Sequence, residues 1–402
     1  MKKEQFPRVP YGSTVHGEEE INAIVEVLKS STQMGAKVNL FEERIAKLFV
    51  KDFGLMTNSG TSALYIAFES LGLEEDSEVI TPALTFATTV ASLVKNGLTP
   101  SFVDVKQNTY CIDEGLIEKS ITNKTKAILA PDLLGNLCDW EEIRRIADKY
   151  NLLVLHDSAD TLGATLNGEY PGKYTDLSIT SFYGSHIING AGNGGMLCTS
   201  DPEILRKGKL LRSWGRASSV FQDSESIEDR FNVNLEGIQY DAKFVFEELG
   251  YQLEPSEISA AFGLVQLDKL QTNLDLRRKY FDLHTQFFSN YEDFVTLPRE
   301  TSGSYTGWLA YPLIVREGAK FTRTELQIFL EERNIQTRVV FTGNILRQPG
   351  FKQIKCVGRA DDFQNSDLVM KGGILLACHH GLNEDLINHI HSSFEIFINK
   401  YT

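Results

Sequence analysis

Four segments of the chain carry residue types that could bind a small anionic ligand and act on it. The first, Thr57-Asn-Ser-Gly-Thr-Ser-Ala-Leu, has the small and hydroxyl-bearing residues that open a helix, where free N–H groups and the positive end of the helix dipole favour a phosphate. The second contains Phe86, which follows a predicted strand and could stack on a planar cofactor. Each also has an ordinary structural explanation, a helix N-cap for the first segment and a core side chain for Phe86.

The other two segments supply groups that could hold or move a proton. Asp157 ends an apolar run, where a carboxylate is costly without a partner such as a protonated ring nitrogen. His186 lies on a short loop before the glycine-rich stretch 190–195, and an imidazole can exchange a proton near neutral pH. A helix-capping aspartate and a structural histidine are the alternatives at these two positions.

Strands that alternate with helices must position these four segments. Short β-branched runs predict strands, and apolar residues at helical spacing between them predict helices, two of which follow the capping residues Asp139 and Asp201. The predicted strands are 78–80, 101–105, 126–130, 152–155, 177–182 and 195–198, and the predicted helices are 86–95, 140–150 and 202–212. This order indicates an α/β fold with a mostly parallel central sheet, whose ligand site lies at the carboxyl ends of the strands.

The C-terminal part of the chain has a different pattern. A helical pattern over 255–288 is followed by predicted strands at 294–298, 307–315, 337–341 and 373–378 and by predicted helices at 322–333 and 384–399. We therefore expect a large domain over residues 1–265 and a smaller α+β domain over residues 266–402.

Composition and charge exclude several classes of function. The 402 residues include 40 Lys and Arg against 54 Asp and Glu, a formal charge of −14 that disfavours nucleic acid as a partner. No apolar run approaches the roughly 18 residues that a membrane span needs. The five cysteines form no C-x-x-C pair, so the sequence predicts the reducing cytoplasm and neither disulfides nor a metal site, with His379-His380 on a surface loop.

The order of a phosphate turn, an aromatic residue, an aspartate and then a serine is what a pyridoxal-phosphate enzyme of fold type I needs, since the cofactor must be held at its phosphate, its ring face and its ring nitrogen. Over nearly its whole length the chain also resembles the DegT-type family of sugar-nucleotide aminotransferases and dehydratases. The motifs that carry this resemblance include Asn58-Ser-Gly-Thr-Ser-Ala, Phe102-Val-Asp-Val, Gly250-Tyr251 and Gly343-Asn-Ile-Leu-Arg-Gln-Pro.

The resemblance implies an aspartate-aminotransferase-like fold, the cofactor pyridoxal 5'-phosphate or pyridoxamine 5'-phosphate, and a homodimer. The residues that it implies for the cofactor are Gly60, Thr61 and Ser181 at the phosphate, Phe86 on the ring, Asp157 at the ring nitrogen, and also Asp160 and, from the second subunit, Gln252. Candidate substrate contacts are Arg216, Arg338 and Asn344. Gln252 stands where relatives have Asn, Glu254 where they have a basic residue, and Ile187 where several have a second His.

The most informative departure is His186, which stands where the family's aminotransferases have the lysine that bonds to the cofactor. This exchange is typical of the branch of 3-dehydratases that act on nucleotide-linked 4-keto-6-deoxy sugars, with His186 as the catalytic group and L-glutamate as the amino donor. The product would be a 4-keto-3,6-dideoxy sugar of the kind built into lipopolysaccharide O-antigens.

The resemblance also separates two types of dehydratase. One type holds an iron–sulfur cluster on three cysteines that follow a Trp-Gly-Arg tripeptide and on a fourth in the segment of the ring-nitrogen aspartate. Here Trp214-Gly-Arg is followed by Ala217-Ser-Ser-Val, and Ala159 occupies the other segment, so we expect the cluster-free type, to which the GDP-4-keto-6-deoxymannose 3-dehydratases belong. Two alternatives remain. One is an aminotransferase-type protein, or a Lys-to-His variant of one, that only retains its ligand, and the other is a cofactor-binding subunit without turnover.

Overall fold

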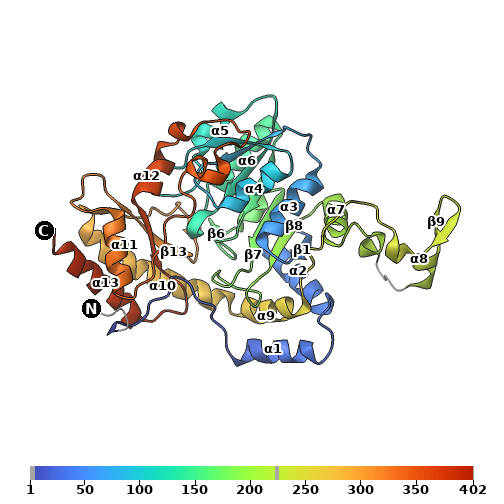
Figure 1. The fold of residues 1–402 in the computed structure, drawn as a ribbon, viewed down its shortest axis with the longest axis horizontal. Helices are drawn as coiled ribbons and strands as arrows, with labels where there is room; N and C mark the ends of the chain where they lie inside the picture. The colour runs from blue at the N-terminus through green and yellow to red at the C-terminus, as the bar shows by residue number, and fades with distance from the viewer. Residues whose placement is uncertain (1–4, 222–225, 402) are drawn as a thin grey trace.

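A seven-stranded sheet forms the centre of the larger part of the molecule in this computed structural model, which describes residues 5–221 and 226–401 (Figure 1). The strand order is β1-β8-β7-β5-β4-β2-β3, and all strands are parallel except β8, which runs antiparallel to its neighbours. The mostly parallel sheet predicted from the sequence is therefore confirmed. The strands are β1 (Phe53–Thr57), β2 (Glu78–Pro82), β3 (Thr99–Val103), β4 (Thr125–Pro131), β5 (Leu153–Asp157), β7 (Leu177–Ser181) and β8 (Gly195–Thr199).

Helices cover both faces of this sheet because alternate side chains of each buried strand point in opposite directions. In β4, Ile128 belongs to the same core cluster as Ile143 of α6 (Trp140–Tyr150) on one face, whereas Leu129 belongs to the cluster that contains Ile66 of α3 (Gly60–Leu71) on the other. Asp139 and Asp201 cap α6 and α7 through their side chains, as the sequence predicts. The helices of this part are α1 (Glu18–Leu28), α2 (Ala36–Leu48), α3 (Gly60–Leu71), α4 (Ala87–Lys95), α5 (Glu114–Ser120), α6 (Trp140–Tyr150), α7 (Pro202–Arg212) and α9 (Glu257–Asp268).

A second core lies in the C-terminal part, around the antiparallel sheet β11-β13-β14. The N-terminal segment joins this core, because Val9 is fully buried and pairs with Ile335. The predicted domain boundary at residue 265 falls inside α9 and stays a prediction. The elements of this part are β11 (Val295–Thr296), β13 (Ala310–Val315), β14 (Gly373–Ala377), α10 (Leu270–Phe288), α11 (Arg323–Glu332), α12 (Gln364–Gly372) and α13 (Glu384–Ile398).

The structure differs from the sequence-based prediction at two C-terminal elements. The helix expected over 255–288 is two helices, since the backbone N–H of Lys269 bonds to the carbonyl of Gln266 and tightens the last turn of α9. The strand expected over 337–341 was wrong: Arg338 makes only an isolated bridge to Leu375, and Phe341 turns the chain with a φ of 42°. The ring of Phe341 lies beside that of Phe86.

A segment between α7 and α9 projects from the body of the molecule (Figure 1). It contains α8 (Ile227–Phe231) and the hairpin β9 (Val233–Leu235) and β10 (Ile238–Tyr240), and we call residues 226–251 the arm. Its exposed apolar side chains include Ile227, Ile238, Phe244, Phe246 and Leu249. Two further short strands, β6 (Thr165–Leu166) and β12 (Ser304–Tyr305), form an antiparallel pair. Among the described residues, no helix is both long and apolar enough to span a membrane.

Candidate active site

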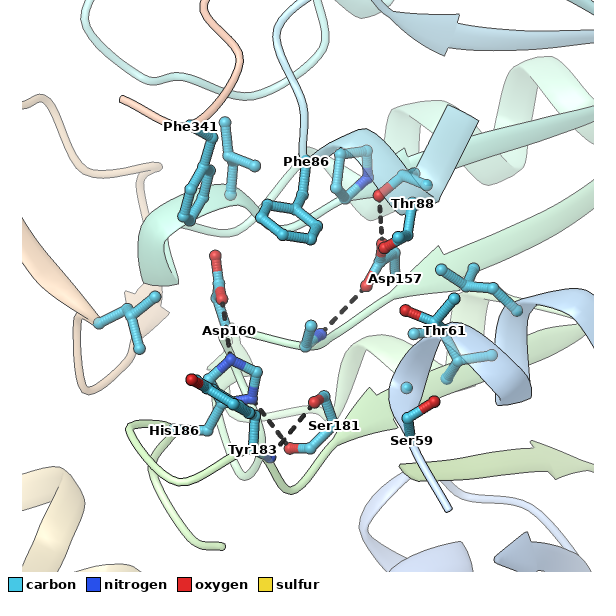
Figure 2. Close-up of a pocket in the computed structure, with 18 of the residues that line it drawn as sticks. Ser59, Thr61, Phe86, Thr88, Asp157, Asp160, Ser181, Tyr183, His186 and Phe341 are labelled. Atoms are coloured by element: carbon cyan, nitrogen blue, oxygen red, sulfur yellow. Dashed lines mark hydrogen bonds and ion pairs between the residues drawn. The ribbon is translucent and has the colours of Figure 1, made fainter. Parts of the chain in front are cut away.

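A cavity of about 320 Å³ lies at the carboxyl edge of the central sheet, where the ends of β5 and β7 meet the first turn of α3 (Figure 2). It is the place where an open parallel sheet binds its ligands. Among the residues predicted for the site, those that line the cavity are Gly60, Thr61, Phe86, Asp157, Asp160, Ser181 and His186. The fold thus brings together residues from four separate stretches of the chain, around residues 60–61, 86, 157–160 and 181–186.

The first turn of α3 forms one end of the cavity. Ser59 is the N-cap, and its Oγ accepts a hydrogen bond from the backbone N–H of Ser62 at 3.1 Å, so the N–H groups of Gly60 and Thr61 lie at the open N-terminus. A Cβ on Gly60 would lie only 2.8 Å from the Cβ of Ser181, which explains why the position is glycine. The close approach places the Ser181 hydroxyl beside the helix N-terminus, in an arrangement suited to a phosphate.

Asp157 is a buried carboxylate at the end of β5, with only 5% of its surface exposed. Its Oδ2 accepts a hydrogen bond from Thr89 at 2.8 Å and its Oδ1 accepts one from the N–H of Ala159 at 3.2 Å. Burial raises its pKa, against these two hydrogen bonds. Within the described part of the chain, no cation lies in salt-bridge range of Asp157, so a protonated ring nitrogen would supply the missing partner.

Aromatic rings form another wall of the cavity. Phe86 is 51% exposed, which is unusual for a core residue, and it contacts Phe341 edge to face at 5.6 Å between ring centroids. Figure 2 shows these two rings on one side of the cavity and His186 with Ser181 on the other. The explanation of Phe86 as a core side chain was therefore wrong, and its ring is placed to cover a planar ligand.

His186 presents a single nitrogen to the cavity. Its Nδ1 lies 3.1 Å from the carbonyl oxygen of Ser181, which can only accept, so Nδ1 carries the proton and Nε2 has the free lone pair. Burial is the main cause that lowers the pKa of His186 to about 4, with a further contribution from Arg277. The sequence suggested a base of ordinary pKa near 6.5. In the fold, the imidazole is instead neutral throughout the physiological range.

Asp160 faces His186 across the cavity floor, with 4.0 Å between its Oδ1 and Nε2 of His186. Its Oδ2 accepts a hydrogen bond from the N–H of Leu134 at 2.9 Å. Burial is the main cause that raises the pKa of Asp160 to about 7, and the nearby Asp157 raises it further. The site therefore has a carboxyl group that titrates near neutrality next to an imidazole that does not.

Three further predicted residues lie outside the cavity. Gln252 pairs with Ser213 through the backbone, and Arg216 stacks over Trp214 with its guanidinium carbon 4.7 Å from the ring centroid. Asn344 is fully buried, and its amide donates to Ala360 and Asp367. The amide of Asn344 thus serves the fold, and its predicted contact with substrate stays a prediction. Gln252 and Arg216 stay predictions.

Arg338 lies behind the cavity rather than in it. Its guanidinium carbon is 5.3 Å from the ring centroid of Tyr11, and Tyr11 lines the cavity. Sequence reasoning missed Tyr11, Asp132, Tyr183 and Phe341, which also line it. Tyr183 had a usable signal, since it lies within the loop that holds His186. Tyr11 had none, because an N-terminal tyrosine reaches the site only through the pairing of its segment with the C-terminal core.

Metal ligation has no support in the described residues, which contain no group of three or more His, Cys, Asp or Glu side chains arranged to hold an ion. All five cysteines are free thiols, and none of them lines the cavity. The expectation that His379-His380 lies on a surface loop was wrong. Both side chains are buried, with Nε2 of His379 bonded to the carbonyl of Pro10 and Nδ1 of His380 accepting from Arg277.

The residues present fit pyridoxal phosphate. The open helix N-terminus with the Ser181 hydroxyl suits its phosphate, the exposed ring of Phe86 suits its ring face, and the uncompensated buried carboxylate of Asp157 suits its ring nitrogen. Among the described residues, no lysine lines the cavity, so no amine is available there to bond to the cofactor.

Comparison with known proteins gives consistent matches over the whole chain. A family model described as the DegT/DnrJ/EryC1/StrS aminotransferase family matches residues 14–395. The lipopolysaccharide biosynthesis protein RfbH of Salmonella typhimurium is 34% identical over 97% of this chain and 91% of its own length. The GDP-4-keto-6-deoxy-D-mannose 3-dehydratase of Yersinia pseudotuberculosis is 30% identical over 94% of this chain and 96% of its own length.

A solved structure is similar as well. The Escherichia coli GDP-4-keto-6-deoxy-D-mannose-3-dehydratase with bound hydrated pyridoxal phosphate superposes with a TM-score of 0.86 at 27% identity, covering 96% of this chain and 99% of the other. The agreement extends over both the central sheet and the C-terminal part, so the two chains share one fold.

Proposed function

Because the chain belongs to the DegT/DnrJ/EryC1/StrS aminotransferase family, whose members use pyridoxal or pyridoxamine phosphate on sugar nucleotides, we propose that it is a 3-dehydratase of a nucleotide-linked 4-keto-6-deoxy hexose. The observation that carries the proposal is His186, whose Nε2 faces a cavity that no lysine lines among the described residues. A histidine at this place can move a proton but cannot hold the cofactor covalently.

When bound, the cofactor would supply an electron sink and an amine, and L-glutamate would give up this amino group together with two electrons and leave as 2-oxoglutarate. The residues of this chain would hold the cofactor and move the proton. Asp157, held by Thr89 and by the N–H of Ala159, would keep the ring nitrogen of the cofactor protonated. Nε2 of His186, on the wall of the cavity opposite Phe86, would take up the proton that the condensed cofactor and sugar release and would deliver it to the C3 hydroxyl as the C3–O bond breaks, so that water leaves. Hydrolysis then releases ammonia and the 4-keto-3,6-dideoxy sugar.

The absence of thiols from the cavity supports the cluster-free type of dehydratase. Ala159 lines the cavity beside Asp157, and Ala217, Ser218 and Ser219 follow Trp214-Gly-Arg, so neither segment offers a ligand to iron. We accordingly propose glutamate as the source of the amino group, with no need for a reductase partner. The five unpaired cysteines agree with the reducing cytoplasm as the compartment.

We also propose that the protein acts as a homodimer. The arm exposes Ile227, Ile238, Phe244, Phe246 and Leu249 together, which a monomer would leave in water. Gln252, which adjoins the arm, lies outside the cavity of its own chain. A second copy that covers the arm would explain both observations, since Gln252 could then serve the cavity of the partner.

To test the proposed dehydratase activity, the purified protein is incubated with pyridoxal phosphate, L-glutamate and a nucleotide-linked 4-keto-6-deoxy hexose. The hexoses tested differ in nucleotide base and in sugar stereochemistry. The proposal expects ammonia and a 3-deoxy sugar nucleotide, identified by mass spectrometry as a loss of water. A 4-amino sugar nucleotide without ammonia would instead identify an aminotransferase. No conversion of any substrate, with cofactor bound, would favour a subunit without turnover.

A further inference from the structure

Arg277, in the middle of α10, is a fully buried cation without a carboxylate partner. In the described part of the chain, no Asp or Glu oxygen lies within the 4.0 Å of an ion pair. Its five N–H groups are nevertheless all used. Nε donates to Nδ1 of His380, Nη1 to the carbonyls of Trp308 and Leu309, and Nη2 to the carbonyls of Ser185 and His186, each at 3.2 Å.

These acceptors lie on three stretches of chain that are far apart in sequence. Ser185 and His186 belong to the loop that ends beside the cavity, Trp308 and Leu309 precede β13, and His380 follows β14. A planar guanidinium with donors in fixed directions can join three such stretches at once, which a flexible lysine amine cannot do. Leu309 itself lines the cavity, so the contact reaches the site from two sides.

We propose that Arg277 is a positioning residue for His186, fixing the main chain of the loop so that Nε2 of the imidazole faces the cavity. This inference rests on the proposed function only in taking His186 as the base. The carbonyl of His186 is held by Arg277 and its Nδ1 by the carbonyl of Ser181, so both ends of the residue are fixed. Little rotation is left for the ring that must reach a reacting atom.

The charge of Arg277 has a second effect on the same histidine. Burial is the main cause that lowers the pKa of His186, of His379 and of His380. The guanidinium, with no carboxylate to neutralise it, lowers these pKa values further because it disfavours a second positive charge nearby. The other titratable groups that interact with Arg277 are Asp160, Tyr11 and Cys378. Burial lowers the pKa of Arg277 itself to about 10, so the guanidinium stays charged at neutral pH.

Two substitutions separate the effect of the hydrogen-bond geometry of Arg277 from the effect of its positive charge. Arg277→Lys keeps a cation but loses the planar arrangement of donors, whereas Arg277→Met keeps the length of the side chain and loses both. Arg278→Met is the matched control, since Arg278 is the next residue of the same helix and pairs at the surface with Asp282 and Glu300. If Arg277→Met does not fold, as judged by circular dichroism, His380→Leu takes its place by removing one acceptor while leaving the charge.

The first readouts use the cofactor-free protein. The pKa of His186, followed by NMR of 15N-labelled histidine, should stay near its low value in wild type, Arg277→Lys and Arg278→Met and rise by roughly half a unit to one unit in Arg277→Met. Amide hydrogen exchange across residues 183–194 should become at least about tenfold faster in both Arg277 variants and in His380→Leu, because loop opening is easier without these bonds.

The second readout is turnover. Arg277→Lys should lower kcat for dehydration by about 100-fold, with KM for the sugar nucleotide changed less than about threefold, as expected for a misplaced base. Folded Arg277 variants whose loop exchange and His186 pKa both match wild type would overturn the proposal. If wild type dehydrates no sugar nucleotide, the proposed function fails, but the NMR and exchange measurements still decide the role of Arg277.

Discussion

Nε2 of His186 and Oδ1 of Asp160 lie 4.0 Å apart, and each group has its proton affinity shifted away from its usual range. Burial lowers the pKa of the imidazole to about 4 and raises that of the carboxyl to about 7. At neutral pH the histidine is therefore a free base, and the aspartate is the group that changes its protonation. We therefore expect Asp160, and not His186, to set the pH dependence of the site near neutrality.

Asp160→Asn should change how stability depends on pH in the cofactor-free protein. An acid whose pKa is raised by folding favours the protonated native state, so wild type loses stability as pH rises from about 4 to 7. An asparagine at this position does not titrate, so the variant does not lose this stability. The free energy of unfolding of Asp160→Asn minus that of wild type should therefore be roughly 2–3 kcal/mol larger at pH 8 than at pH 5. Denaturant unfolding at both pH values measures it.

The control for this measurement is Asp148→Asn, at an exposed carboxylate that pairs with Arg144. Its stability relative to wild type should change by less than about 1 kcal/mol over the same interval. Equal pH dependence of wild type and Asp160→Asn would contradict the raised pKa of Asp160.

His186→Lys should bind the cofactor covalently and should lose most of the dehydration activity. The amine would reach the position of the imidazole and bond to pyridoxal phosphate, so borohydride reduction should add the mass of the cofactor to the variant and not to wild type. Dehydration should fall by at least about 100-fold, because the new amine is occupied by the cofactor. Intact-protein mass spectrometry measures the added mass of the cofactor, and the rate of ammonia release measures dehydration. If His186→Asn dehydrated the sugar nucleotide at the same rate as wild type, His186 would not be the catalytic base.

Thr89→Val should weaken cofactor binding. The Thr89 hydroxyl donates to Oδ2 of Asp157 at 2.8 Å, and a hydrogen bond to a charged group contributes about 1.5–3 kcal/mol. Without it, the carboxylate that pairs with the ring nitrogen is less stable in its ionised form, and the Kd of pyridoxal phosphate should rise by roughly 10- to 100-fold. Absorbance titration measures the change. Thr89→Ser keeps the hydroxyl and should bind like wild type, so an equal loss in both variants would point to packing instead.

Removal of iron should leave activity unchanged. None of the cavity-lining residues is a cysteine, and alanine and serine occupy the segments in which the family resemblance implies cluster cysteines for the other type of dehydratase. We expect the same rate of ammonia release after treatment with an iron chelator and without any added reductase. A rate that depends on iron or on a reductase would refute the cluster-free assignment.

Leu249→Asp should dissociate the proposed dimer. Leu249 is 93% exposed in the single chain, and a twofold interface would contain the substitution twice. Placing a carboxylate there should raise the dimer Kd by at least about 100-fold and, if Gln252 serves the partner's cavity, weaken cofactor binding as well. Sedimentation velocity follows the first effect. Glu248→Gln, at the neighbouring exposed residue, should remain a dimer, and a wild-type monomer with full activity would exclude the dimer altogether.

The sequence by itself determined most strands and several helices of the large part, together with the class of cofactor, but it did not predict α1, α2, β1 or α5. Helices α6 and α7 begin after Asp139 and Asp201 because capping is a local interaction between residues two or three apart. Likewise, the phosphate turn, Phe86, Asp157 and Ser181 each sit at the end of a predicted strand or the start of a predicted helix, so the topology of a parallel sheet brings them together.

Only the tertiary structure decided how these residues behave. The low pKa of His186 comes from burial and from Arg277, which lies 91 residues away, and the raised pKa of Asp160 comes from burial beside Asp157. Tyr11 reaches the cavity because Val9 pairs with Ile335, and Phe341 reaches it because the chain turns where the sequence pattern predicts a strand. Such contacts depend on which distant segments pack together, and burial in a medium of low polarity then sets the charge of each group, which no local pattern of residues encodes.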